Sequence, residues 1–110
     1  MSDMLTVSKK LGYKVVVMSN EEAIVTGGYA GDLLSDVMGH AQEGEILITI
    51  QAHKNSIAVA SLLGLSGIII CNSRDVSDDM KLAAKEQGIT LFTTSDTQYR
   101  ASIHLASVLA

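Results

Sequence analysis

The sequence predicts an α/β fold: a single small domain with a mainly parallel sheet of about four to five strands, βαβ crossovers and helices packed on the sheet. The segments ILITI (46–50) and GIIIC (67–71) are apolar almost throughout. Strands of this composition are typically covered on both faces, as they are in parallel sheets. In the second half of the chain such strands alternate with segments of helical periodicity, which indicates repeated βαβ crossovers.

The individual elements follow from apolar periodicity and from the polar residues and glycines that interrupt it. In chain order we expect a helix at 3–11, strands at 13–18 and 23–26, a helix at 32–41, and then strand–helix pairs at 45–50 and 55–63, at 67–71 and 77–87, and at 89–93 and 96–109. Gly27 and Gly28 are expected to end the second strand. The first two strands could instead pair as an antiparallel hairpin at one edge of the sheet.

Side chains that accept a backbone hydrogen bond predict where helices begin. Asp32 or Ser35 is expected to cap the helix at 32–41, and Ser95 or Asp96 to cap the last helix. Glycines directly follow several of the helical segments, where they commonly stop a helix.

Length and composition suit one domain that spans residues 1–110. Of the 110 residues, 47% are hydrophobic, so the chain can bury a core without disulfides. The apolar runs are shorter than the ~20 residues of a transmembrane helix, and the N-terminus lacks the pattern of a signal peptide. We therefore expect a cytoplasmic protein that does not bind membranes.

Charge and cysteine content exclude several classes of function. The net charge is −4 and the eight Lys and Arg residues are dispersed along the chain, so we expect no nucleic-acid binding. The single cysteine, Cys71, excludes an internal disulfide and a multi-cysteine metal site. At the end of an apolar run, it is expected to be a buried, unreactive thiol. The three histidines lack the spacing of a metal site, and we expect neither a metal nor a cofactor.

Polar residues follow the apolar strands, and these junctions form the candidate ligand site. In an open parallel sheet, ligands bind outside the carboxyl ends of the strands. The candidate ligand-binding residues are Gly27, Gly28, Gln51, His53, Asn55, Asn72, Thr94 and Asp96. The glycine pair could cradle a phosphate, but it lacks the spacing of a phosphate-binding loop, and a turn explains it more simply.

Two interpretations of His53 remain open. Near the positive end of helix 55–63, its imidazole could transfer a proton or bind an anion, with Lys54 as a charge partner. Alternatively, His53 or Asn55 is the N-cap of this helix and Lys54 is solvated. An enzyme usually pairs such a base with an orienting acid, and the sequence pairs none with His53. We therefore name no catalytic residue.

Two helical segments carry more apolar surface than a small domain can cover. Segment 55–63 is apolar nearly all round, and segment 96–109 raises the same question. Because exposed apolar surface favours association, we expect a homodimer.

Four segments, in their order and spacing, resemble the DRTGG domain family. They are GDLLSDVM (31–38), EGEILIT (43–49), LLGLSGIII (62–70) and EQGITLFTTSDTQYRA (86–101). The resemblance extends from about residue 11 to residue 108, nearly the whole chain. The residues that give the family its name are replaced here: Ala52 and His53 stand at its Asp-Arg pair, and Cys71, Asn72 and Ser73 at its Thr-Gly-Gly.

The resemblance implies a non-catalytic regulatory or dimerisation module, similar to the N-terminal domain of HPr kinase/phosphorylase. Domains of this family occur in phosphotransacetylases and between the nucleotide-sensing CBS domains of some pyrophosphatases. It therefore implies a small anionic ligand such as a nucleotide. Two alternatives stay open. One is an accessory protein that binds a hydrogenase-type or other redox or metabolic enzyme, since stand-alone relatives occur beside iron hydrogenase subunits. The other is a small enzyme that uses His53.

Overall fold

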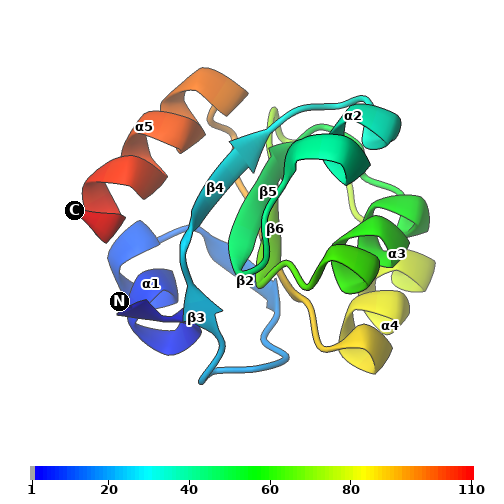
Figure 1. The fold of residues 1–110 in the computed structure, drawn as a ribbon, viewed down its shortest axis with the longest axis horizontal. Helices are drawn as coiled ribbons and strands as arrows, with labels where there is room; N and C mark the ends of the chain where they lie inside the picture. The colour runs from blue at the N-terminus through cyan, green and yellow to red at the C-terminus, as the bar shows by residue number, and fades with distance from the viewer. Residues whose placement is uncertain (1) are drawn as a thin grey trace.

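The computed structural model describes residues 2–110 and shows a five-stranded sheet between two layers of helices (Figure 1). The elements are, in chain order, β1 (Ser2–Asp3), α1 (Met4–Leu11), β2 (Lys14–Val17), β3 (Ile24–Val25), β4 (Gly27–Ala30), α2 (Leu34–His40), β5 (Glu45–Thr49), α3 (Lys54–Leu63), β6 (Gly67–Ile70), α4 (Asp78–Gln87), β7 (Thr90–Thr93) and α5 (Gln98–Leu109). The strand–helix pairs expected in the second half of the chain are all present, with bounds close to the predicted ones.

The main sheet has the strand order β2-β7-β6-β5-β4. Strands β4, β5, β6 and β7 run parallel, whereas the edge strand β2 is antiparallel to β7. The predicted α/β fold with a mainly parallel sheet is therefore confirmed. The alternative hairpin of the first two predicted strands is wrong, because β2 pairs with β7 while β3 pairs with the short β1.

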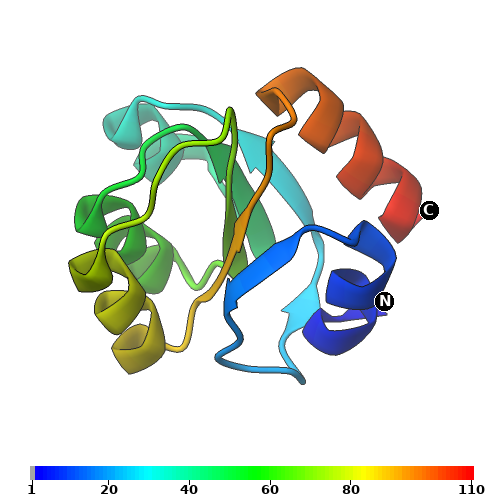
Figure 2. The ribbon, with the colours of Figure 1, turned by 180° about the vertical axis from the view of Figure 1, so that it is seen from behind.

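Helices cover both faces of the sheet (Figures 1 and 2). On one face α2, α3 and α4 contribute Val37, Ile57 and Met80 to the core, and on the other α1 and α5 contribute Met4 and Leu105. Because both faces are covered, β5 and β6 are buried at nearly every position, which explains their continuous apolar sequence. None of the helices within residues 2–110 combines the length and the apolarity that a membrane span requires.

The segment after Thr26 differs from the prediction. Gly27 and Gly28 do not end a strand but begin β4, which pairs in parallel with the start of β5. A Cβ atom at Gly28 would lie 2.8 Å from Cδ2 of Leu105. The missing side chain thus allows α5 to pack directly on this edge strand, and the sequence GGYA is a strand although its composition is that of a turn.

Candidate functional site at the carboxyl edge of the sheet

The carboxyl ends of β5, β6 and β7 bring together most of the polar residues that the sequence singles out. The residues in the segments that follow these strands are Gln51, His53, Asn55, Asn72, Thr94 and Asp96. Gly27 and Gly28 lie at the amino end of β4, where Gly27 pairs with Glu45 at the start of β5. Placing the two glycines at the ligand edge was therefore wrong, because they are part of the strand and not of the turn that follows it.

Asp32 joins three segments at this edge. Its Oδ1 accepts hydrogen bonds from the Thr49 hydroxyl (2.8 Å), the Ile50 N–H (2.9 Å) and the Gln98 side-chain amide (3.2 Å). The prediction that Asp32 or Ser35 caps α2 is wrong, since α2 begins without a side-chain cap. The Asp32 carboxylate instead holds the β4–α2 turn, the end of β5 and the start of α5 together.

His53 is the N-cap of α3, so the simpler of its two interpretations is confirmed. Its Nδ1 accepts a hydrogen bond from the N–H of Asn55 at 3.0 Å, which places the proton of the neutral ring on Nε2. Gln51 donates its side-chain amide to the Asp32 carbonyl at 3.0 Å, and its own carbonyl accepts from the Ser56 hydroxyl at 2.7 Å. Within residues 2–110 no hydrogen bond joins His53 to a carboxylate, so these contacts give the turn a structural role.

The loops after β6 and β7 are tied together through the backbone. Asn72 and Ser73 adopt left-handed conformations, with φ of 61° and 55°. Their N–H groups donate to the carbonyls of Asp96 and Thr94, each at 3.0 Å. The backbone donors of this turn are thus occupied, while the side chains of Asn72 and Ser73 are exposed at the surface.

The start of α5 also differs from the prediction. Thr97, and not Ser95 or Asp96, is the N-cap, and its hydroxyl accepts a hydrogen bond from the N–H of Arg100 at 3.2 Å. The Asp96 carboxylate is engaged elsewhere, since its Oδ2 accepts a hydrogen bond from the Tyr13 hydroxyl at 2.7 Å. This contact links the beginning of the chain to the loop after β7.

Cys71 directly follows β6 and is fully buried, as expected. Burial raises the pKa of the Cys71 thiol to about 11, and the negative charges of Asp96 and Asp32 add to the shift. The pKa of Tyr13 is also raised, first by burial and then by its hydrogen bond to Asp96. The thiol is therefore protonated at neutral pH, and the protonated form is the poor nucleophile.

A groove of about 680 Å³ lies beside this edge, between the start of β2, the loop after β6 and the end of β7. We call it the basic groove. Three of the eight basic side chains of the protein line it, namely Lys14, Arg74 and Lys81, against the single carboxylate of Asp75. The rest of its lining consists of hydroxyl-bearing and apolar residues: Ser73, Thr93, Thr94, Ser95, Val15, Val16 and Val76. In a chain with a net charge of −4, this local excess of positive charge favours an anionic ligand.

Sequence reasoning missed the basic groove because its charges come from separate segments. Lys14 opens β2, Arg74 follows β6, and Lys81 lies on α4. The basic residues are dispersed along the chain, but the antiparallel pairing of β2 with β7 brings Lys14 opposite Thr93, at the carboxyl edge. To predict that Lys14, Arg74 and Lys81 lie together, one would need the strand order, which the sequence does not specify.

Comparison with known proteins supports the fold. No protein-family model and no curated protein matches the chain. Among solved structures, it is similar to the CBS and DRTGG domains of the regulatory region of Clostridium perfringens pyrophosphatase, complexed with the activator diadenosine tetraphosphate. The TM-score is 0.73 at 16% sequence identity, and the match covers 96% of this chain and 46% of the other, so the chain spans less than half of that length. The structural match thus confirms the resemblance to the DRTGG domain at the level of the fold. In the pyrophosphatase, this fold is part of the regulatory region.

Proposed function

We propose that residues 1–110 form a regulatory module without a catalytic step, which binds a small phosphorylated ligand such as a nucleotide at the carboxyl edge of the sheet. The observation that carries this proposal is the basic groove, in which Lys14, Arg74 and Lys81 face a single carboxylate. The likeness to a regulatory region solved with diadenosine tetraphosphate supports the choice of a nucleotide.

The groove offers each part of such a ligand a suitable environment. The guanidinium of Arg74 can bind two phosphate oxygens at once, and Lys14 and Lys81 supply compact positive charges. Within residues 2–110, the Lys81 ammonium forms one ion pair, a 3.9 Å contact with the exposed carboxylate of Asp78, and exposed pairs of this kind cost little to break. The valine side chains of the lining provide an apolar wall on which a base or its sugar can pack.

A thermal-shift panel tests this proposal. The ligands are ATP, diadenosine tetraphosphate and pyrophosphate, with adenosine as the control that lacks phosphate. At a hundredfold excess over Kd, a ligand adds about 2.7 kcal/mol to the free energy of unfolding, which raises the melting temperature of a domain of this size by roughly 10–20 °C. The absence of a shift with all three phosphorylated compounds, or an equal shift with adenosine, would contradict the proposal.

We also propose that the chain forms a homodimer. Leu62 on α3 is 71% exposed and Tyr99 on α5 is 76% exposed, so both helices on which this expectation rests keep large apolar side chains at the surface. Light scattering at high micromolar concentration should give twice the mass of the chain. A monomer at that concentration would refute the dimer and leave the proposed ligand site unaffected.

A further inference from the structure

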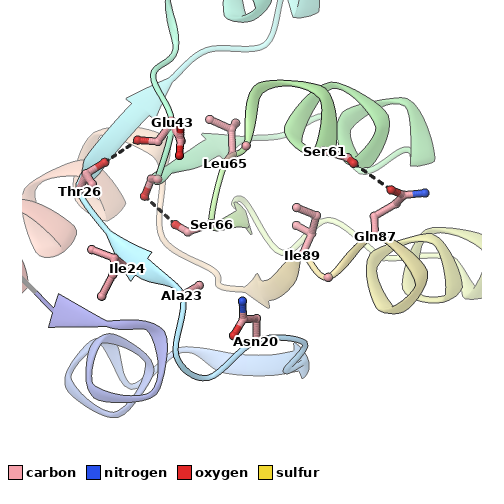
Figure 3. A pocket seen from close by; sticks show the side chains of 13 residues that line it. Asn20, Ala23, Ile24, Thr26, Glu43, Ser61, Leu65, Ser66, Gln87 and Ile89 are labelled. Atoms are coloured by element: carbon pink, nitrogen blue, oxygen red, sulfur yellow. Dashed lines mark hydrogen bonds between the residues drawn. The ribbon is translucent and has the colours of Figure 1, made fainter.

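Figure 3 shows a second pocket, which lies beside the amino ends of β5, β6 and β7. The basic groove lies at the other end of the sheet. The second pocket has a volume of about 530 Å³ and is bounded by the C-terminal ends of α3 and α4, the turn before β5 and the segment before β4. We propose that this pocket binds a small organic cation that carries a primary ammonium or guanidinium group. The proposal is independent of the proposed function, because the two sites share no residue.

The described residues that line this pocket give it a net negative charge. Glu43 is the one charged side chain among the lining residues. The helices α3 and α4 both end here, at Gly64 and Gly88, which adopt left-handed conformations as C-caps. The C-terminal end of a helix carries partial negative charge from its free carbonyl groups. Two helix ends and a carboxylate therefore converge on a space that no basic side chain within residues 2–110 lines.

The position of Glu43 conflicts with the usual rule for charges at helix ends. A Cβ atom at Gly64 would lie 3.2 Å from Cγ and 3.8 Å from Cδ of Glu43, so this side chain lies against the C-cap of α3. A carboxylate is disfavoured at the C-terminal end of a helix. The Glu43 side chain is exposed, and within residues 2–110 its carboxylate has no hydrogen bond or ion pair to another protein group. A bound cation can therefore pair with it without breaking a contact inside the protein.

The walls of the pocket are held in place by hydrogen bonds that Figure 3 shows. The Ser61 hydroxyl donates to Oε1 of Gln87 at 2.8 Å and joins the two helix ends. The Thr26 hydroxyl donates to the backbone carbonyl of Glu43 at 2.9 Å, which fixes the turn that carries the carboxylate. These contacts prepare the site before a ligand enters, which lowers the entropic cost of binding.

The remaining lining distinguishes an organic cation from a metal ion. Ile24, Leu65 and Ile89 line the pocket; Leu65 and Ile89 are buried, so the exposed apolar surface comes mainly from Ile24, which is 45% exposed. An alkyl chain between two nitrogen groups would cover this surface, whereas a bare ion would not. The described residues contain no group of three or more His, Cys, Asp and Glu side chains that could hold a metal ion. The chemistry therefore favours a di- or polyamine or a guanidinium compound.

Titration by two-dimensional NMR with agmatine and spermidine tests the proposal. We expect saturable shifts of the backbone amides of Gly44, Gly64 and Gly88, with Asn72 and Thr94 at the other edge unchanged. The variant Glu43→Gln, which keeps the shape of the side chain, should weaken binding about tenfold or more, as expected for the loss of one charge-assisted contact. The control Asp79→Asn removes the same charge from an exposed position in the first turn of α4, outside the lining, and should bind as the wild type does.

Thermal unfolding of the ligand-free variants gives a second readout. Glu43→Gln should melt at the same temperature as the wild type or higher, because it removes a charge that the end of α3 disfavours. A drop in melting temperature would show that the carboxylate serves stability, and would overturn the argument. The proposal also fails if neither amine gives saturable shifts at the three glycines, or if Glu43→Gln and Asp79→Asn weaken binding equally.

Discussion

Replacing Asp32 by alanine should lower the free energy of unfolding more than the position of Asp32 in a surface turn suggests. The Asp32 carboxylate is the acceptor for the hydroxyl of the fully buried Thr49, for the Ile50 N–H and for the Gln98 amide. A buried donor that loses its partner costs about 1–3 kcal/mol. Because water can reach part of this half-buried site, we expect Asp32→Ala to lower the free energy of unfolding by about 2–4 kcal/mol, with a drop in melting temperature of roughly 10–20 °C.

Urea denaturation of three variants tests the role of Asp32, provided that the slope of the transition stays unchanged. Asp32→Asn retains an acceptor oxygen and should lose about 1 kcal/mol or less. Asp75→Ala removes an exposed carboxylate and should stay within about 0.5 kcal/mol of the wild type. If Asp32→Ala is as stable as Asp75→Ala, the hydrogen-bond argument is refuted. If Asp32→Asn is as unstable as Asp32→Ala, the charge and not the acceptor is what matters.

Three further predictions follow from local geometry. A Cβ atom at Gly67 would lie 2.9 Å from the Thr90 carbonyl oxygen, so Gly67→Ala should lower the free energy of unfolding by about 1–3 kcal/mol. Gly39→Ala, at a position in α2 where a Cβ atom would meet no neighbour, should raise it by up to about 1 kcal/mol; equal effects of the two variants in urea denaturation would contradict the close packing at Gly67. The pKa of Cys71 is raised to about 11 from an ordinary value near 9, so between these pH values the native state retains a proton that the unfolded state loses. The free energy of unfolding should therefore fall as pH rises from 9 to 11, and should fall less in Cys71→Ala; the same pH dependence in that variant as in the wild type would exclude the thiol as a cause. His53→Ala should lose about 1 kcal/mol, a typical cost of a lost N-cap, while His53→Ser should lose less; equal losses in urea denaturation would show that the cap does not account for the stability.

The elements that the sequence predicts well are those whose local pattern and tertiary environment agree. The strands β5 and β6 are continuous apolar runs and lie in the middle of the sheet. The helices that follow them end at Gly64 and Gly88, as glycine C-caps predict. For these strand–helix units, residue propensity, the apolar pattern and the glycines that end the helices all indicate the same structure, so the βαβ organisation can be predicted from the sequence alone.

The parts that the sequence does not predict depend on contacts between distant segments. Strand β4 has the composition of a turn, but it pairs with β5, and its Gly28 leaves room for Leu105 of α5 to pack on it. Asp32 resembles a helix cap, but its carboxylate accepts hydrogen bonds from β5 and α5 instead. The positive charge of the basic groove exists only once β2 has paired with β7. Each of these features is fixed by tertiary structure, which a local pattern does not encode.

The central claim is that the basic groove is a site for a phosphorylated ligand, and isothermal calorimetry with ATP tests it most directly. The double variant Lys14→Ala/Arg74→Ala removes two of its cations, and Lys10→Ala/Lys85→Ala removes the same charge from residues that do not line it. We predict saturable binding by the wild type, a loss of about tenfold or more in affinity for the first variant, and a change of about twofold or less for the second. Absence of binding by the wild type, or equal weakening in both variants, would contradict the claim.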